Sequence, residues 1–422
     1  MKPSLNLKRR VGILVIARAL FTFFQWLMLA SVVHLTGPAT VGVYGTALAV
    51  ATMVFRFADF GIVGAVTTDI HGEYQLRDYY RLRWCLNLAA AMALIGIVFF
   101  AYGLNETAII CLALLFPKLV ESQSTFTYGI YQRANRVEWV GVSLLARGVA
   151  GTFGFIGMLW ITKSLLTAVL AMGAAWLLVA ITLDAWFVVK AMALVVSTQV
   201  TEENVGHQVR EHELWHLTKR LCPLGVAGLL AYILGALPTV FLEGMHPLEI
   251  AGVYTAIYYP FQAANMIVKS MGEALLQPLA KSAQEGRNIQ SARILLRAVT
   301  AIACVCLIGI CVAFFAGDQV LSLMYSPVYA NYSGEFTLLA VAWSFRYLGA
   351  TLKLVPTAKR NFAASLKLHF VAALPMLFVA PFLIHKYELV GAVYSVMISH
   401  FVFMLGAAHL ARSEFGFAVE RG

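Results

Sequence analysis

Charged residues are scarce in this sequence: Asp, Glu, Lys and Arg make up only 12% of the 422 residues, whereas 60% are hydrophobic. A soluble domain carries roughly a quarter charged residues. A chain of this length with so few charges cannot cover the surface of a soluble protein, so most of its surface must face lipid. The composition therefore predicts a membrane protein and argues against a soluble enzyme.

The sequence also lacks the motifs of several enzyme classes. No G-x-x-x-x-G-K-[ST] segment occurs, which excludes nucleotide hydrolysis by that route. No Asp-x-Asp pair is present to bind a metal-linked nucleotide sugar, and the six cysteines show neither zinc-type spacing with histidine nor the pattern of a disulfide framework. We therefore expect a protein that is not an enzyme and that uses no cofactor and no metal.

Long apolar runs are abundant. A membrane-spanning helix needs about 20 mostly apolar residues, and runs of this kind recur along the whole chain. The twelve predicted spans are 11–36, 40–66, 84–103, 107–131, 138–160, 164–189, 214–242, 249–279, 296–315, 334–357, 363–384 and 389–411. The fold class expected from this pattern is an all-α integral membrane protein of about 12 transmembrane helices.

The positions of the cations support this span count. Lys and Arg gather in cytoplasmic segments of membrane proteins, and with both termini inside, those segments hold most of the 31 Lys and Arg residues, including Arg77, Arg81 and Arg83. The opposite side holds only Lys163 and Lys386. The net charge of +10 thus reflects topology and contact with anionic lipids. Nucleic-acid binding is a poor alternative because the cations are spread over many segments. A multi-pass membrane protein with cytoplasmic termini is predicted.

The chain repeats internally. Pro38 followed by Gly-Val-Tyr at 42–44 opens the second span, and Pro247 followed by Gly-Val-Tyr at 252–254 opens the eighth. A Leu-Ile-Gly triplet also occurs in both the third and the ninth span. Two halves of six spans each keep the same orientation, which gives a parallel repeat of the kind found in transporters. The predicted division is a lobe at 1–196, a polar cytoplasmic linker at 197–213, and a lobe at 214–422.

Several charges lie inside the predicted spans, where insertion costs roughly 2.5–3.5 kcal/mol for each one. The cations are Arg18, Arg56, Lys118, Arg147, Lys269 and Arg346, and the carboxylates are Asp59, Glu121, Asp184 and Glu273. Residues of this kind usually face a bundle interior or a hydrated cavity. They also join polar stripes at helical spacing, because Gln25 follows Arg18 at a step of seven, and Gln262 and Asn265 precede Lys269.

Two interpretations of these charges stay open. Arg56 with Asp59, Lys118 with Glu121, and Lys269 with Glu273 have the i,i+3 or i,i+4 spacing at which opposite charges neutralise each other on one helix. Alternatively, the stripes line a common cavity. Arg18, Arg147 and Arg346 have no carboxylate at those spacings, so we expect these three to line a cavity or a pathway.

The segments 35–44 (LTGPATVGVY) and 57–61 (FADFG) resemble the opening of the polysaccharide-transporter family, which comprises flippases for O-antigen and lipid-linked oligosaccharides. The segment 320–325 (VLSLMY), with Tyr329 after it, is similar to the second-half pattern of that family. The resemblance implies a flippase that moves a polyprenyl-diphosphate-linked oligosaccharide from the cytoplasmic to the outer leaflet by alternating access through a cationic cavity. It also implies a monomer in the bacterial inner membrane, surrounded by membrane lipids, that works beside a glycan polymerase or other assembly proteins.

The expected substrate is anionic, and arginine suits it because the guanidinium group makes paired contacts with phosphate and stays charged. The candidate substrate-binding residues are Arg18, Arg56, Lys269, Arg147, Arg346, Gln25, Gln262 and Asn265, and the candidates for coupling to an ion are Asp59, Asp184 and Glu273. One alternative is a cation-coupled drug or small-molecule antiporter of the same superfamily, for which an acidic cavity would be expected. A second is an integral-membrane glycosyltransferase or polymerase, which should carry a large outward loop; the segment 316–333 offers only Asp318 as an acidic residue before Glu335.

Overall fold

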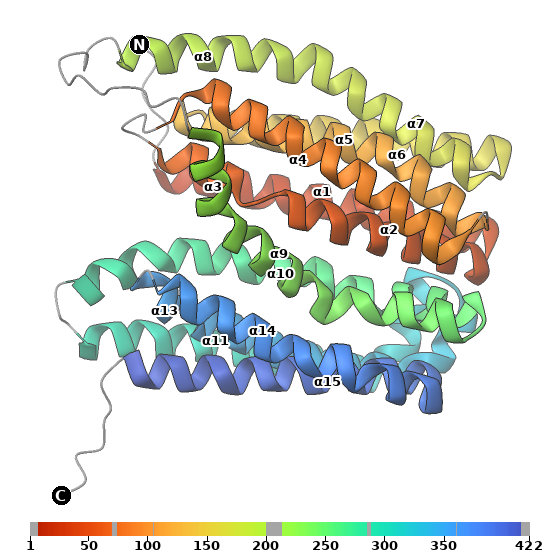
Figure 1. Cartoon of the computed structure of the whole chain (residues 1–422). Coiled ribbons are helices and arrows are strands. Elements are labelled where there is room, and N and C mark those ends of the chain that lie inside the picture. Colours follow the sequence, from red (N-terminus) through yellow and green to blue (C-terminus); the bar gives the residue numbers. More distant parts are fainter. Residues whose placement is uncertain are drawn as a thin grey trace, which may run out of the picture. The chain divides into compact units, whose positions relative to one another are not determined.

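The computed structural model describes residues 7–69, 74–103, 105–199, 213–284, 288–359 and 361–414. In these ranges the chain consists of helices joined by short turns, without strands (Figure 1). The helices are α1 (Leu7–Thr36), α2 (Pro38–Ala58), α3 (Ile62–Thr68), α4 (Leu76–Ile97), α5 (Glu106–Arg133), α6 (Val137–Thr162), α7 (Leu165–Val179), α8 (Ala185–Gln199), α9 (Glu213–Met245), α10 (Leu248–Gln284), α11 (Asn288–Met324), α12 (Ser333–Leu352), α13 (Leu354–Ala358), α14 (Phe362–Phe378) and α15 (Ala380–Glu414). Shorter elements are the π-turns η1 (Val98–Tyr102) and η2 (Ala180–Asp184) and the 3₁₀ helix η4 (Pro327–Tyr332).

The membrane-spanning segments follow the predicted pattern. Ten helical segments of the described residues are long and apolar enough to cross a membrane. The polar helix α10 and the shorter apolar helix α14 are not among those ten and bring the number to about twelve. The chain is therefore an all-helical, multi-pass membrane protein. Its lipid-facing surface is rich in exposed aromatic side chains, such as Phe100 at 88% exposure and Phe382 at 78%.

Local breaks in these helices have clear causes. The second span is divided into α2 and α3 where Phe60 and Gly61 adopt left-handed backbone angles, with φ of 47° and 63°. The last two spans are separated at Glu388 (φ 49°), inside α15. The segment 316–333, which was expected to be an outward loop, is mostly helical. Helix α11 continues to Met324 past a kink at Ala316, and η4 begins at Pro327.

The helix contacts divide the described chain into two compact units. The first comprises described residues of Met1–Ser31 and Ala47–Leu229, and the second those of Val32–Thr46 and Leu230–Gly422. Three helices therefore cross from one unit to the other. The last residues of α1 and the first residues of α2 belong to the second unit, and α9 is divided after Leu229. The lobes predicted at 1–196 and 214–422 stay a prediction, and residues 200–212 of the predicted linker 197–213 lie outside the described residues.

Candidate functional site

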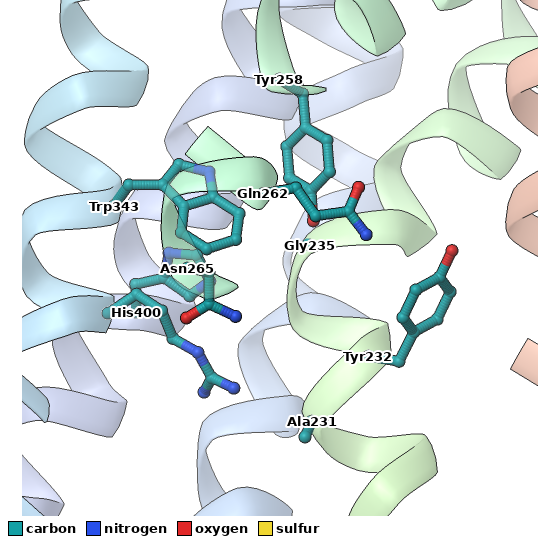
Figure 2. A pocket seen from close by; sticks show the side chains of 9 residues that line it. Ala231, Tyr232, Gly235, Tyr258, Gln262, Asn265, Trp343 and His400 are labelled. Carbon is teal, nitrogen blue, oxygen red and sulfur yellow. The ribbon is translucent and has the colours of Figure 1, made fainter. Parts of the chain in front are cut away.

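A polar and aromatic pocket lies inside the second unit, among α9, α10, α12 and α15. Its cavity volume is about 60 Å³, well below the roughly 300–1,000 Å³ typical of pockets that hold a whole small molecule, so there is room for one chemical group of a ligand. Its lining residues are Ala231, Tyr232, Gly235, Tyr258, Gln262, Asn265, Trp343, Arg346 and His400. Figure 2 shows side chains from several helices turned toward one another around this space.

Helical spacing explains how the pocket is built. Tyr258, Gln262 and Asn265 follow one another at steps of four and three along α10, so that they share a helix face. Trp343 and Arg346 stand three residues apart on α12. Gly235 of α9 is needed here because a Cβ at that position would overlap the Tyr258 hydroxyl.

The charge of the pocket comes from Arg346. Its guanidinium carbon lies 4.4 Å from the centre of the Phe403 ring. Its Nη1 atom is buried and has no hydrogen-bond partner among the described residues, and the same holds for Nε1 of Trp343. No carboxylate is among the lining residues of this pocket. A buried N–H donor that lacks a partner is costly unless a ligand or water accepts from it, so the pocket suits an anion with polar groups.

His400 closes the pocket from α15. Its Nδ1 atom lies 3.2 Å from the carbonyl oxygen of Ala342, and its ring centre is 5.2 Å from that of Trp343. His400, Trp343 and Tyr232 were not among the sequence-predicted site residues. Trp343 had a usable signal, because it lies one helical turn before Arg346. His400 had none, because nothing in the sequence tells which helix packs against α12.

The other predicted site residues lie outside this pocket. Arg18 and Gln25 of α1 are half-buried in the first unit, and Arg56 of α2 is exposed. Lys269 is exposed on α10, and the side chain of its predicted partner Glu273 lies outside the described residues. The structure therefore brings Gln262, Asn265 and Arg346 together in one site.

One of the three same-helix spacings at which opposite charges could neutralise each other forms an ion pair. Lys118 Nζ lies 2.9 Å from Glu121 Oε2, as the i,i+3 spacing indicated. The ion pair of Asp59 is formed instead with Arg83, at 3.1 Å, a residue that the sequence placed in a cytoplasmic segment. Arg83 is buried at 3% exposure inside α4, which the prediction of a cytoplasmic segment had not indicated.

Two further predicted residues are deeply buried in the first unit. Arg147 of α6 is 1% exposed and Asp184, the last residue of η2, is 2% exposed. Arg147 donates to the Tyr128 hydroxyl at 3.2 Å, and its guanidinium carbon lies 4.6 Å from the centre of the Trp176 ring. They form a cluster separate from the pocket of the second unit.

Residues 7–284, about two thirds of the chain, match the family described as polysaccharide biosynthesis protein. The chain belongs to this family. A curated relative is the capsular polysaccharide biosynthesis protein CapF of Staphylococcus aureus, which is 23% identical over 401 residues, covering 92% of this chain and 95% of the relative. The family supports a transporter involved in polysaccharide biosynthesis, and not an enzyme.

Solved structures with the same fold are transporters of the MOP superfamily. One from Pyrococcus furiosus, whose binding pocket is described as having reverse polarity, has a TM-score of 0.68 at 13% identity, covering 98% of this chain and 96% of that one. A MATE transporter of Vibrio cholerae has a TM-score of 0.66 at 15% identity, covering 96% and 95%. At these identities the similarity establishes the fold alone, and with the family it gives a multi-pass membrane transporter.

Proposed function

We propose that this transporter moves a polyprenyl-diphosphate-linked oligosaccharide from the cytoplasmic to the outer leaflet. The observation that carries the proposal is the pocket around Arg346, a half-buried cation whose Nη1 atom is buried without a partner, with amide and aromatic side chains around it and no carboxylate in the lining. Membership of the polysaccharide biosynthesis family supports the same substrate class.

The chemistry of the lining fits a phosphorylated glycan. Arg346 offers N–H donors to an anionic oxygen, and a charge-assisted hydrogen bond of this kind is stronger than a neutral one. The amides of Gln262 and Asn265 can both donate to and accept from sugar hydroxyls. The flat faces of Tyr258 and Trp343 provide apolar surface for sugar rings. The lipid tail would remain in the bilayer while the head group crosses.

Residues outside the pocket extend this proposal. Arg18, Arg56, Lys269 and Gln25 stay proposed substrate-binding residues, each within its own unit and separate from the Arg346 pocket. The working protein would be a monomer that receives its substrate from glycan assembly proteins in the same membrane. Alternating access would expose the site first to one side of the membrane and then to the other.

The test is a strain in which the gene is deleted and replaced by single variants. Arg346→Ala should reduce glycan export by about 10- to 100-fold, because loss of a charge-assisted contact is worth about 1.5–3 kcal/mol. Lipid-linked glycan should then accumulate on the cytoplasmic leaflet, which is measured with a membrane-impermeant glycan label before and after the cells are opened.

A matched control is Lys386→Ala, which removes an exposed cation from the same unit. It should leave export unchanged at equal amounts of protein in the membrane. Arg346→Lys keeps the charge but not the paired donors and should give intermediate export. Full export by Arg346→Ala would refute the role of the pocket, and export that persists in the deletion strain would refute the flippase itself.

A drug antiporter is the second candidate, since MATE transporters share the fold. A cationic drug would be repelled by Arg346 in this pocket, whereas an anionic glycan would be attracted. Drug resistance that is lost in the deletion strain, with normal glycan export, would favour the antiporter.

A further inference from the structure

The first unit buries two opposite charges close to each other without joining them directly. Arg147 of α6 and Asp184 of η2 are 1% and 2% exposed, and the charge of each acts on the other. Nevertheless no ion pair within 4.0 Å forms between them in the described structure. Such an arrangement is unusual, because buried ions normally pair in full to offset the loss of water.

Both side chains keep unused polar atoms. Nε and Nη2 of Arg147 and both carboxylate oxygens of Asp184 are buried and have no hydrogen-bond partner of good geometry among the described residues. The hydroxyls of Ser124 and Ser143 approach the Asp184 carboxylate, and Oγ of Ser124 also lacks a partner. The site therefore has more donors and acceptors than the bonds it forms, all of them hidden from bulk solvent.

A chain of hydroxyl groups connects the two charges. Arg147 Nη1 donates to the Tyr128 hydroxyl at 3.2 Å, and that hydroxyl lies 2.9 Å from Oγ of Ser143, which approaches Asp184. Tyr131 donates to the main-chain oxygen of Asp184 at 2.9 Å and so fixes this end of the chain. Hydroxyl groups can both donate and accept, so the chain can be reoriented when a proton is gained or lost.

The backbone at Asp184 is also unusual. Asp184 is the last residue of the π-turn Ala180–Asp184, which lies between the regular helices α7 and α8. Single π-turns inside helices are rare and occur frequently at functional sites. Here the extra residue in the turn places a carboxylate toward α5 and α6, whose hydroxyls and arginine surround it.

The remaining charges around the site are accounted for. From α5, Glu121 also feels the charge of Arg147, but Lys118 neutralises it at 2.9 Å. Tyr128 and Tyr131 are the titratable groups that α5 presents to Asp184, and Arg147 is the one that α6 presents. From α7, Trp176 covers Arg147 with its ring and donates Nε1–H to the Arg147 carbonyl oxygen at 3.1 Å. Of the two carboxylates near Arg147, Glu121 forms an ion pair with Lys118, whereas Asp184 forms none.

We propose that Asp184 is a proton-binding site whose occupancy is sensed by Arg147. A buried carboxylate without a paired cation gains free energy by taking up a proton, whereas a buried arginine stays charged. The proton comes from water and forms the O–H bond of a neutral carboxyl group, and Arg147 then loses an attractive partner. When the proton leaves, Arg147 is drawn back toward Asp184. The site converts proton binding into movement of a side chain that packs against α1 and α7.

A proton fits this site better than a metal ion. The positive charge of Arg147 repels a cation such as Na⁺, but it does not prevent a neutral carboxyl group from forming. No group of three or more His, Cys, Asp or Glu that could hold a metal occurs among the described residues. The inference concerns the energy source of transport and does not depend on which substrate the pocket of the second unit takes.

The test is infrared difference spectroscopy of the purified, lipid-reconstituted protein, without any glycan, as the pH is lowered from about 9 to about 5. Wild-type protein should show a carboxyl C=O band that grows as Asp184 takes up its proton. The band should be absent in Asp184→Asn. It should remain in the matched control Asp318→Asn, which changes an exposed carboxylate of α11. In Arg147→Gln the band should appear at higher pH, because a nearby positive charge that opposed protonation is gone.

A second readout follows Arg147 itself. In a variant that keeps Trp176 and replaces the other tryptophans with phenylalanine, the fluorescence of Trp176 should change over the same pH range. Asp184→Asn should abolish that change, and Asp184→Glu should keep it. The proposal would be overturned by a wild-type spectrum without the carboxyl band, or by a band that is unchanged in Asp184→Asn. It would also be overturned if the Trp176 fluorescence changed when choline chloride is replaced by NaCl at constant pH, and did not change with pH. Because no glycan is used, failure here would leave the flippase proposal standing, and failure of that proposal would leave this one testable.

Discussion

Replacement of Gly252 by leucine should prevent folding, so that no folded protein is recovered from the membrane. The smaller change Gly252→Ala should lower the free energy of unfolding by about 1–3 kcal/mol. A Cβ at Gly252 would overlap the carbonyl oxygen of Pro38 and would lie 2.9 Å from the amide nitrogen of Gly42. Both neighbours are main-chain atoms of α2, so no side-chain rotation can make room. The measurement is thermal unfolding of detergent-purified protein, followed by size-exclusion chromatography.

The reason for this sensitivity is a reciprocal contact. A Cβ at Gly42 would overlap the carbonyl oxygen of Leu248, just as one at Gly252 meets Pro38. Each helix therefore offers a carbonyl oxygen at one position and a glycine four residues later, and each glycine fits against the other helix's carbonyl. Close helix packing through small residues is a main source of association in membranes, where apolar burial contributes little.

The matched control is Gly309→Ala. Gly309 belongs to the other repeated triplet, Leu-Ile-Gly, and a Cβ there would meet nothing within 4 Å. We expect a change within about 0.5 kcal/mol, as for an ordinary surface substitution. Equal melting temperatures for Gly252→Ala and Gly309→Ala would show that the contact between α2 and α10 does not hold the fold.

Replacement of Arg83 by methionine should destabilise the first unit by about 3–5 kcal/mol, the cost of breaking a buried ion pair from one side. Arg83 donates from Nε and Nη2 to the carbonyl oxygen of Ser122, at 3.2 and 2.9 Å. Its Nη1 donates to the carbonyl oxygen of Ala58 and to Oδ1 of Asp59, at 3.4 and 3.1 Å. One side chain of α4 thus holds the end of α2 and the middle of α5.

Methionine fills similar space but leaves these oxygens without a donor, which costs more than the bonds themselves contribute. The control is Arg81→Met, two residues earlier on α4, where the side chain is exposed. Arg83→Met should melt well below wild type and Arg81→Met close to it. If the two variants melted together, the bonds of Arg83 would contribute nothing measurable to stability.

The spans themselves could be predicted because their signal is local. Twenty apolar residues in a row, ended by glycine, proline or charge, predict a spanning helix whatever surrounds it. For the same reason Lys118 and Glu121 could be paired from their spacing on one helix. The predicted repeat of Gly-Val-Tyr also has a structural meaning, since its glycines meet in the contact between α2 and α10.

Contacts between helices could not be predicted. Arg83 lies only one residue before the predicted third span, and no local pattern indicates that α4 begins at Leu76 and buries this side chain. Asp59 was equally well placed for Arg56 on its own helix, yet its ion pair is with α4. Helical periodicity tells which residues share a face, but it does not tell which neighbouring helix that face meets.

The amino-acid sequence alone thus determined that this protein crosses the membrane many times and that its spans are interrupted by costly charges, and it predicts that the two halves repeat. These properties follow from hydropathy, spacing and charge sign, which need no partner. Only the tertiary structure decided that Arg346 opens into a pocket with Gln262 and Asn265, and that Arg147 and Asp184 lie buried together without a direct bond. Such groupings join residues far apart in the chain, and packing of one helix against another is what places them.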